Sequence, residues 1–477
     1  MSHQATRRQF LQASAVAGIG YWVAGGVQAQ ESKSPNERIA MASIGYGNKG
    51  VGDFADAGKH GDMVTICDVD EDKLDAAARS FPKAKKYVDF RKMLDEMGKS
   101  IDAVTVSTPD HMHAAAALMA MRMGKHAFVQ KPMTRTIYEA RLMAEVARKM
   151  KVATEMGNQY TASESLRKAA AALRQGVVGT VKEVHVWTNR PIWPQGRDRA
   201  PSKECPKNLH WLLWLGAAPV RPYAENYHPF AWRGWWDFGS GALGDMACHT
   251  VNMPYMGLDL KNPTSVQAEC SGHNGDSYPD SSVIHFEFPA NDWRPALKFT
   301  WYDGGEIPPP ELFNELISLY QAELKKGEGK KAGGKKASVN KAETKKAQER
   351  KIPPFVRSGC IVVGDKATLF SPGDYAERKI KLSDGKDLPE VDFVKSPGHF
   401  EEWVRAIKGG EPARSNFPDY AGGLTETILL GNLAVWVAAT GQGEKVEWDA
   451  QNLKSLNVPG LEQIIKPIYR PGYTLDA

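Results

Sequence analysis

Short apolar runs alternate with amphipathic segments in the first part of the chain. Runs of four to six residues predict buried strands at Ile39–Ile44, Met63–Cys67, Ala103–Val106, His126–Val129 and Val152–Glu155. Between them, apolar residues recur at helical spacing, which predicts helices at Gly52–Ala57, Glu71–Phe81, Phe90–Glu96, Ala114–Met123 and Ile137–Lys149. Alternation of strand and helix is typical of a parallel, doubly wound sheet, so residues 38–157 are predicted to form one α/β domain.

The pattern changes after residue 157. A helix is predicted at Ala162–Gln175, and apolar and polar residues then alternate in Lys182–Asn189, Thr264–Ser271, Ser282–Phe288, Ala296–Trp301 and the hairpin Cys360–Phe370. Such alternation is typical of an antiparallel sheet with one solvated face. Helices are predicted at His399–Lys408 and Tyr420–Thr440, and the tail Glu462–Tyr469 is a final amphipathic segment. Residues 158–477 are therefore predicted to form an α+β domain around a large, mostly antiparallel, open-faced sheet.

Residues 321–351 are rich in lysine, glycine and alanine. They hold eleven Lys and Arg against four Glu, so removing their net +7 from the chain total of +5 leaves −2 for the rest. This composition predicts a flexible insertion in the second domain. Because the folded body is not basic, a nucleic-acid-binding function loses its support.

The first thirty residues have the pattern of an export signal. Arg7 and Arg8 precede Phe10 and Leu11, and an apolar stretch with a small-residue cleavage site follows. This is typical of a twin-arginine signal peptide at residues 1–30, with a polar linker at 31–37. An ordinary secretory signal and an uncleaved anchor are the alternatives. We expect export to the periplasm or the cell exterior, with no permanent membrane span after cleavage.

The first predicted strand runs directly into the sequence GYGNKG, which matches G-x-G-x-x-G. In a strand–turn–helix unit, Gly45 allows the tight turn, Gly47 lets the backbone approach a pyrophosphate, and Gly50 lets helix and strand pack closely. Free N–H groups at the start of the helix then hold the phosphates. The predicted cofactor contacts from this turn are Gly45, Tyr46, Gly47, Asn48, Lys49 and Gly50.

Asp68 ends the second predicted strand, 23 residues after Gly45. A carboxylate at this place accepts hydrogen bonds from the ribose hydroxyls of the adenosine half of a dinucleotide. No Arg or Lys stands beside it before Lys73 to pair with a 2′-phosphate, so NAD is favoured over NADP. The alternative role for Asp68 is a helix N-cap, but Asp70 fits that cap better because Glu71 opens the next helix.

Two further strand ends carry candidate cofactor contacts, because ligands of open α/β sheets bind at the carboxyl ends of the strands. The candidates are Ser107, Thr108, Pro109, His113, Gln130 and Lys131. His111 and His113 resemble a metal pair, but no further ligands stand at metal spacing, so capping or cofactor contact is favoured. The five cysteines are scattered without a CxxC, and we predict neither a disulfide framework nor a metal site.

The segment 211–236 concentrates aromatic residues in loop-like sequence. Clustered aromatics are more often core than site, but these are interleaved with His, Arg, Asn and Pro. Indole faces stack on the C–H faces of sugar rings, so sugar binding and core packing are both open. The candidate substrate contacts are Tyr160, Arg190, His228, Trp232, Arg233 and Trp236.

Asp245 and His249 stand four residues apart, which places them on one face of a helix predicted to begin at Asp245. A carboxylate one turn before a histidine orients the imidazole and raises its basicity. The alternative is that Asp245 caps the helix and His249 is a packed surface residue.

These motifs together resemble the Gfo/Idh/MocA family, which includes glucose–fructose oxidoreductase, inositol dehydrogenase and the rhizopine-catabolism oxidoreductases. The resemblance covers nearly everything after the signal and rests on GYGNKG, Asp68, Ser107-Thr108-Pro109 with His113, Gln130-Lys131-Pro132, and Asp245-x-x-x-His249. The family usually has Glu-Lys-Pro, so Gln130 removes a negative charge near the site. The resemblance implies an N-terminal Rossmann domain, a substrate domain, a nicotinamide cofactor and a dimer or tetramer paired through the large sheet.

The same resemblance implies the roles of three catalytic residues. His249 is the base for a hydroxyl proton, Lys131 orients that hydroxyl and helps to carry the proton, and Asp245 positions His249 or a sugar hydroxyl. Gln159 is a further candidate cofactor contact. The predicted reaction is hydride transfer between a carbon of a sugar, polyol or glycoside and the nicotinamide.

Export bears on the cofactor, because soluble NAD is not expected in the periplasm and the twin-arginine route carries folded proteins. We therefore predict a tightly held NAD that is recycled internally. Recycling admits oxidation of one sugar with reduction of another, or glycoside cleavage by transient oxidation and elimination. A sugar-binding protein without catalytic activity is the third alternative.

Overall fold

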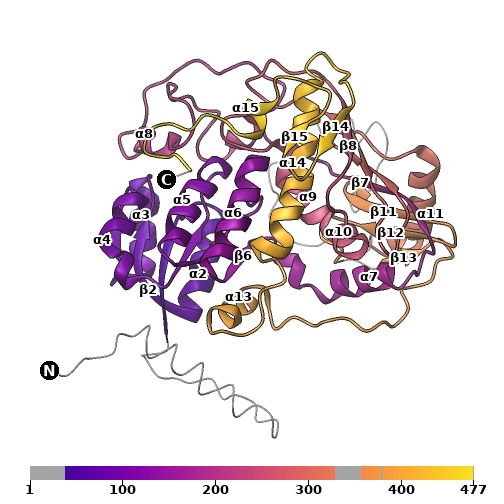
Figure 1. The fold of residues 1–477 in the computed structure, drawn as a ribbon, viewed down its shortest axis with the longest axis horizontal. Helices are drawn as coiled ribbons and strands as arrows, with labels where there is room; N and C mark the ends of the chain where they lie inside the picture. The colour runs from indigo at the N-terminus through magenta and orange to yellow at the C-terminus, as the bar shows by residue number, and fades with distance from the viewer. Residues whose placement is uncertain (1–37, 328–355, 378–379, 476–477) are drawn as a thin grey trace, which may run out of the picture.

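Two sheets, each with its own helices, lie side by side in the molecule (Figure 1). The computed structural model describes residues 38–327, 356–377 and 380–475. The predicted signal peptide at 1–30, the linker at 31–37 and most of the predicted insertion at 321–351 lie outside the described residues. Within those ranges, no helix has both the length and the apolar character that a membrane crossing requires.

The N-terminal sheet has six parallel strands in the order β3-β2-β1-β4-β5-β6. Its strands are β1 (Ile39–Ile44), β2 (Gly61–Cys67), β3 (Lys85–Tyr87), β4 (Ala103–Val106), β5 (His126–Val129) and β6 (Thr154–Met156). Every position of β1 is buried, as expected for a strand with helices on both faces. The strand order reverses between β1 and β4, and this is where open α/β sheets bind ligands. The predicted doubly wound sheet is confirmed.

The helices of this domain are α2 (Lys49–His60), α3 (Glu71–Ser80), α4 (Phe90–Met97), α5 (Asp110–Arg122) and α6 (Ile137–Met150). Helices α2 and α5 begin earlier than predicted. Their first turns consist largely of polar residues and glycine, so no apolar residues at helical spacing mark them in the sequence. The prediction missed β3, since two of its three residues are exposed and no apolar run marks it.

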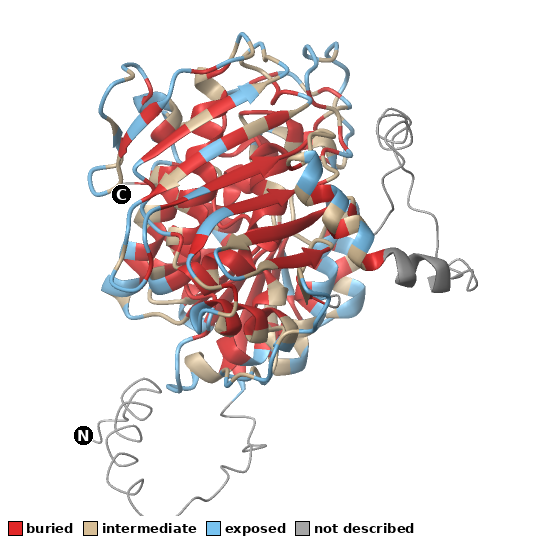
Figure 2. Cartoon of the chain, turned by 90° about the vertical axis from the view of Figure 1, so that its right-hand side faces the viewer, coloured by how far each residue is buried: buried red, intermediate tan, exposed pale blue. Residues whose placement is uncertain are grey.

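The second sheet has nine strands in the order β13-β12-β11-β7-β10-β9-β8-β14-β15. They are β7 (Val181–Trp187), β8 (Ser265–Cys270), β9 (Ser282–Phe288), β10 (Leu297–Tyr302), β11 (Gly359–Gly364), β12 (Thr368–Pro372), β13 (Lys381–Leu382), β14 (Val446–Asp449) and β15 (Lys454–Ser455). All neighbouring pairs are antiparallel except β7 and β10, which confirms the predicted mostly antiparallel sheet. Seen from the side of this sheet, its strands are mostly buried, with exposed positions between (Figure 2).

Helices pack on the inner face of the second sheet and against the first domain. They include α7 (Glu164–Arg174), α9 (Gly241–Thr250), α10 (Asn252–Leu258) and α14 (Gly422–Val437). The buried side chains of α9 and α14 join one core with the apolar positions of β8 and β9. α14 also meets α6, where Arg141 donates two hydrogen bonds to Glu426 at 2.7 and 2.8 Å.

The outer face of the second sheet is divided between an apolar and a polar part. Helix α11 (Pro310–Gly327) covers the apolar part, where Phe313 and Leu316 pack in one cluster with Trp187 and Tyr302. The part over β8 and β9 presents polar positions, namely Gln267, Glu269, His285 and Glu287. The predicted pairing of subunits through this sheet stays a prediction, and the polar part is the face that α11 leaves uncovered.

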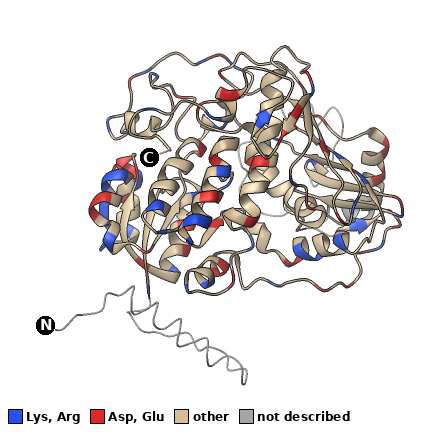
Figure 3. Ribbon diagram, in the orientation of Figure 1, with Lys and Arg blue, Asp and Glu red and all other residues tan. Residues whose placement is uncertain are grey.

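The second half of the chain returns twice to the first domain. Helix α13 (His399–Ile407) places Phe400 and Trp403 against Phe128 of β5, with ring centroids 5.1 and 5.7 Å apart. The C-terminal tail runs back past α4 and α5, where Arg91 donates a hydrogen bond to the Gly472 carbonyl at 3.3 Å (Figure 1). In Figure 3, Lys and Arg positions are interspersed with Asp and Glu positions along the described ribbon. The α13 and C-terminal contacts thus join the second half of the chain to the first domain.

Candidate active site

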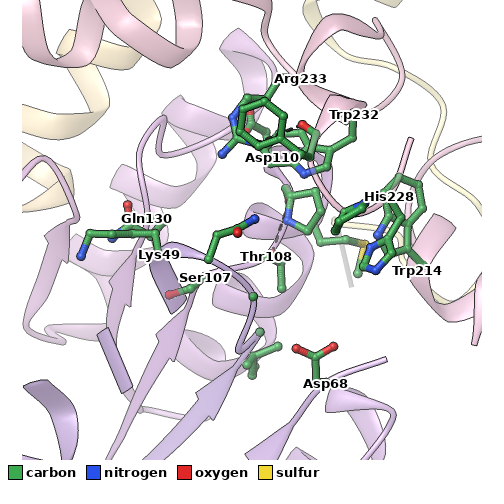
Figure 4. A pocket seen from close by; sticks show the side chains of 18 of the residues that line it. Lys49, Asp68, Ser107, Thr108, Asp110, Gln130, Trp214, His228, Trp232 and Arg233 are labelled. Carbon is green, nitrogen blue, oxygen red and sulfur yellow. Dashed lines mark hydrogen bonds between the residues drawn. The ribbon is translucent and has the colours of Figure 1, made fainter. Parts of the chain in front are cut away.

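A cavity of about 400 Å³ lies where the carboxyl ends of β1, β2, β4 and β5 meet the second domain. Asp68 stands at one end of it, and Arg233 and Asp110 stand at the other (Figure 4). Most of the predicted site residues line this cavity: Gly45, Gly47, Asn48, Lys49, Asp68, Ser107, Thr108, Pro109, Gln130, Lys131, Gln159, Arg190, His228, Trp232, Arg233, Asp245 and His249. The fold therefore brings residues from both domains to one place.

The glycine turn fits a dinucleotide at three positions. A side chain at Gly45 would stand 2.6 Å from the Ser107 carbonyl oxygen, and one at Gly50 would stand 2.4 Å from the Gly45 oxygen, so both positions exclude larger residues. At Gly47 an added carbon meets no protein atom within 4 Å, which leaves the backbone open to the cavity. The start of α2 has neither a side-chain cap nor an acidic residue in its first turn. The Gly50 and Val51 N–H groups donate to the Gly47 and Asn48 carbonyl oxygens at 2.8 and 3.4 Å, so the N–H groups of Asn48 and Lys49 are the ones available to a pyrophosphate.

Asp68 lies at the end of β2 and lines the cavity. Its Oδ2 accepts from the Tyr46 N–H at 2.7 Å, and its Oδ1 accepts from the Asp70 N–H at 2.9 Å. Burial raises the pKa of Asp68 to about 6, although these two bonds oppose the shift. Asp70 is the cap of α3, where it accepts from the Asp72 N–H, as predicted. Asp68 is thus free of the capping role, and its remaining lone pairs suit ribose hydroxyls.

Asp53 was not predicted from the sequence, yet it organises the centre of the site. This buried carboxylate of α2 accepts from Lys49 Nζ at 2.6 Å, Ser107 Oγ at 2.7 Å and Gln130 Nε2 at 2.8 Å. The carboxamide at Gln130, where the family usually has a glutamate, is therefore matched by a carboxylate on the neighbouring helix. Three donors around one acid hold the turn, β4 and β5 together.

Gln130→Glu is expected to destabilise the fold by about 2–4 kcal/mol at pH 8, because it places a second carboxylate against buried Asp53. In the folded variant the two carboxyl groups would share a proton, whereas in the unfolded chain both are ionised above their usual pKa. The loss of folding stability should therefore grow as pH rises from 5 to 8. Urea unfolding at both pH values measures it. Asp53→Asn in the same chain exchanges the two groups and should restore stability. A single variant as stable as wild type would contradict this account.

Lys131 and Asp245 meet across the domain boundary. Lys131 Nζ donates to the Asp245 backbone oxygen at 2.8 Å and to its Oδ1 at 3.0 Å, and Arg233 Nε donates to the same Oδ1 at 3.1 Å. Burial would raise the pKa of Asp245, but the charges of Lys131 and Arg233 outweigh it and hold the pKa well below its usual value. Two cations thus share one carboxylate, which leaves positive charge at this end of the cavity.

His249 lines the cavity one turn after Asp245 and is 4% exposed. Its Nδ1 is buried and has no hydrogen-bond partner among the described residues. The hydrogen bonds of the Asp245 carboxylate go to Lys131 and Arg233 instead. Burial lowers the pKa of His249 well below its usual value, and the Lys131 charge lowers it further. The imidazole is therefore neutral at physiological pH and able to accept a proton.

The helix that carries these two residues begins earlier than the sequence suggested. α9 starts at Gly241, which has a φ of 66°, so Asp245 lies inside the helix rather than at its start. The N-cap alternative for Asp245 is wrong, because four helical residues precede it. The alternative that His249 is a surface residue is also wrong, since the side chain is buried.

Three predicted cofactor contacts support the walls of the cavity from behind. Gly50 packs under the turn, and the Tyr46 ring packs on Phe54 with centroids 4.9 Å apart. His113 is buried and lies within hydrogen-bond distance of the Thr108 and Pro132 carbonyl oxygens, at 2.8 and 2.9 Å. The backbone N–H of Tyr46 still reaches the site through Asp68.

His111 is also buried and contacts two backbone carbonyl oxygens, those of Trp214 at 2.9 Å and Phe238 at 3.3 Å. Across the ranges that the structure describes, no three His, Cys, Asp or Glu side chains are grouped to hold a metal. The two histidines of this motif therefore tie loops of the two domains to α5.

Two predicted substrate contacts also lie outside the cavity walls. The Trp236 ring stacks on Tyr278 with centroids 3.8 Å apart, and the side chain is 8% exposed. Tyr160 stacks on Tyr375 at 4.1 Å, and it is Tyr375 that lines the cavity. Most of the aromatic residues of segment 211–236 form a core cluster, but Trp214 and Trp232 of that cluster also line the cavity. The cluster is therefore packed, and sugar binding by these two rings stays a prediction.

Two further residues in the cavity stand in no recognisable sequence pattern. Asp110 opens α5, and accepts from Ser240 Oγ at 2.6 Å, and burial raises its pKa to about 7. Tyr375 comes from the loop after β12, and burial together with Asp374 raises its pKa to about 12. An isolated Asp after Pro and an isolated Tyr in a loop match no motif.

A Rossmann sheet with an open glycine turn, facing a lysine, a carboxylate and a histidine, defines a two-domain dinucleotide-dependent oxidoreductase. The model of the oxidoreductase family with an NAD-binding Rossmann fold matches residues 38–158, and the model of its C-terminal alpha/beta domain matches residues 163–290. Together they cover more than half of the sequence, and the chain belongs to the Gfo/Idh/MocA family. Its N-terminal domain is an NAD-binding Rossmann domain.

Curated relatives match shorter stretches. Levoglucosan dehydrogenase of Pseudarthrobacter phenanthrenivorans is 25% identical over 37% of this chain and 37% of its own length. A glycosyl hydrolase family 109 protein of Saccharopolyspora erythraea is 28% identical over 38% of this chain and 45% of its own length. The chain spans about a third to a half of the length of the curated relatives it matches.

Solved structures share the fold. The WlbA dehydrogenase from Bordetella pertussis, in complex with NADH and UDP-GlcNAcA, is 16% identical with a TM-score of 0.56. The alignment covers 87% of this chain and 99% of that one. At this identity the likeness concerns the fold, which agrees with the two sheets described above.

Proposed function

We propose that this protein transfers a hydride between a secondary alcohol carbon of a sugar, polyol or glycoside and NAD. One observation carries the proposal. Lys131, held by its hydrogen bond to Asp245, lines the same cavity as the buried His249 and the glycine turn. Sugar dehydrogenases and glycosyl hydrolases among the matched relatives support a carbohydrate substrate.

When bound, NAD supplies the acceptor for the hydride that leaves the alcohol carbon. The protein has to take the hydroxyl proton and stabilise the developing alkoxide. His249 is neutral and faces the cavity, so it takes the proton. Lys131 directs its ammonium group at the hydroxyl oxygen, and Asp245 holds Lys131 in place. Arg190 and Arg233 offer donors to the other hydroxyls of the sugar.

The test is direct transfer to bound cofactor. The protein is mixed with myo-inositol, D-glucose, D-galactose, N-acetyl-D-galactosamine and their p-nitrophenyl glycosides where these exist, and absorbance at 340 nm is followed. A rise with at least one sugar supports the proposal. No rise with any sugar, together with no transfer of deuterium from a carbon-labelled sugar to the bound cofactor, would refute hydride transfer.

We also propose that the protein is exported and keeps its cofactor, as the twin-arginine motif suggests. A segment of the second domain, residues 205–230, supports retention, and we call it the adenosine strap. Its Asn208 carbonyl accepts from the Glu71 N–H at 2.9 Å, and Asn208 Nδ2 donates to Asp70 Oδ1 at 3.0 Å. His228 also contacts Asp70, at 3.2 Å, and lines the cavity. The strap is thus bonded to the start of α3, two residues after Asp68, and its His228 lines the same cavity.

Purified mature protein is expected to carry about one NAD per chain through gel filtration and to release it on denaturation, because the strap blocks the adenosine end. Mass spectrometry of the acid supernatant measures it. Asn208→Ala removes the side-chain bonds to Asp70 and Asp72 and should lose NAD faster. Lys168→Ala breaks a salt bridge between Lys168 and Glu390 away from the cavity and is the control. Empty protein that is fully active with added NAD would contradict retention.

A second candidate function is glycoside cleavage by transient oxidation and elimination. The matches to glycosyl hydrolase family 109 proteins favour it. In this reaction the cofactor is reduced and then reoxidised in each cycle, so aglycone is released without net NADH. Product analysis beside the absorbance trace separates it from sugar-to-sugar oxidoreduction.

Subunit pairing through the large sheet is a further proposal, which light scattering tests.

A further inference from the structure

Tyr375 stands directly beside His249. It lies in the loop that follows β12, and its ring meets the His249 ring nearly at right angles, at 80°, with centroids 4.8 Å apart. The Tyr375 ring is also stacked on Tyr160, 4.1 Å away and within 9° of parallel. The imidazole therefore packs against an aromatic pair rather than an isolated side chain.

No hydrogen bond of the described residues holds the His249 ring. Its Nδ1 is buried without a partner, and the Asp245 carboxylate one turn before it is engaged by Lys131 and Arg233. A histidine side chain rotates about two bonds, and proton transfer needs one ring nitrogen aimed at the substrate. The orientation has to come from packing, and Tyr375 is the ring in contact.

The loop that carries Tyr375 is itself fixed on both sides. The N–H of Gly373, which has a φ of 88°, donates to the Ser358 carbonyl at 2.8 Å. On the other side, Ala376 is buried with a φ of 52°, a left-handed conformation that only a surrounding structure holds in place. Asp374 pairs with Arg190 of the cavity wall at 3.6 Å. Tyr375 is thus a rigid part of the wall.

We propose that Tyr375 is a positioning residue for the base: its ring fixes the plane of His249 so that the imidazole faces the substrate. The inference rests on the proposed function of His249 as the base. It is the aromatic ring that acts here, so phenylalanine should replace tyrosine and an aliphatic side chain should not. Edge-to-face packing of this kind is specific in geometry as well as favourable in energy.

The first test needs no substrate. In protein labelled at the Cε1 carbon of histidine, the His249 NMR signal is assigned as the one lost in His249→Gln. Wild type and Tyr375→Phe should each give one narrow His249 signal, because one ring orientation is populated. Tyr375→Leu should give several signals or a broadened one. Tyr473→Leu, which removes another ring of the cavity lining, is the control and should leave the signal narrow. One narrow signal in Tyr375→Leu would overturn the proposal.

The second test measures the rate at which the most active sugar of the panel reduces bound NAD. Tyr375→Leu should lower the maximal rate constant by about 10²-fold, the loss typical of a misplaced reacting group, with half-saturation changed less than threefold. Tyr375→Phe should keep the rate within about threefold of wild type, as expected when the hydroxyl plays no chemical part. Equal losses in both variants would overturn the proposal by assigning the effect to the hydroxyl.

Failure of the proposed role of His249 and failure of the proposed role of Tyr375 give different results. An active His249→Ala would refute His249 as the base and leave the NMR result on ring orientation standing. A narrow signal in Tyr375→Leu with an inactive His249→Ala would refute only the role of Tyr375.

Discussion

Lys131→Met lowers the rate of hydride transfer to bound NAD by about 10³-fold, the upper part of the range for removing one preorganised donor at a developing oxyanion. Lys131 Nζ lies 3.0 Å from Asp245 Oδ1 in the cavity wall, and methionine keeps an unbranched side chain one atom shorter, without the charge. Asp245 keeps its bond to Arg233, so the carboxylate does not become a buried unpaired charge. The loss therefore reports the missing cation near the substrate oxygen.

The measurement is the pre-steady-state rise at 340 nm with the fastest sugar of the panel. Lys131→Arg keeps the charge but changes the donor geometry, and it should fall between wild type and Lys131→Met. NAD content after gel filtration should stay at the wild-type value in both variants, because the glycine turn and Asp68 are untouched. Near-normal hydride transfer in Lys131→Met would remove Lys131 from the mechanism.

His249→Ala is expected to lower the same rate by about 10²–10⁴-fold, as for the loss of a general base. The cavity keeps Lys131 and Asp245, so binding of sugar and NAD should change little. The pH profile tests the role independently. Because burial and Lys131 lower the pKa of His249, the imidazole is already neutral at pH 6.5, and the wild-type rate should not rise between pH 6.5 and 8 on its account.

The same lowered pKa makes a prediction about stability. The unfolded histidine binds a proton near its usual pKa of about 6.5, whereas the folded imidazole does so only at lower pH. Stability is therefore complete above pH 6.5 and falls as pH drops through that value towards the folded pKa. His249→Gln should reduce this part of the acid destabilisation in urea unfolding between pH 7 and 5. An unchanged pH dependence would mean that His249 is accessible to protons in the folded protein.

Much of the fold follows from local patterns. The buried strands of the first domain read as continuous apolar runs, and the glycine turn and Asp68 lie at fixed spacings around β1 and β2. The boundaries were less predictable, because the first turns of α2 and α5 are built from polar residues and glycine. The strand β3 has one buried residue and cannot be recognised without its neighbour β2.

The candidate site was predictable where residues lie in motifs, and less so where they act through partners. Gln130 departs from the usual family pattern in the sequence, but no sequence pattern points to Asp53, which lies 77 residues away and accepts its hydrogen bond. Trp236 and Trp232 look alike in sequence, yet one packs on Tyr278 and the other lines the cavity. Which of two neighbouring loop side chains is packed and which lines the cavity depends on how the whole domain folds around the loop.

The sequence by itself determined the class of fold and the dinucleotide turn, because each depends on period, spacing or local turn geometry. It indicated Lys131, Asp245 and His249 as catalytic candidates only through their resemblance to a family. The tertiary structure decided which of those residues meet. Lys131 contacts Asp245 across 114 positions of chain, which leaves His249 against Tyr375 instead of a carboxylate. Such contacts follow from the packing of two domains around a cavity, and no local pattern records them.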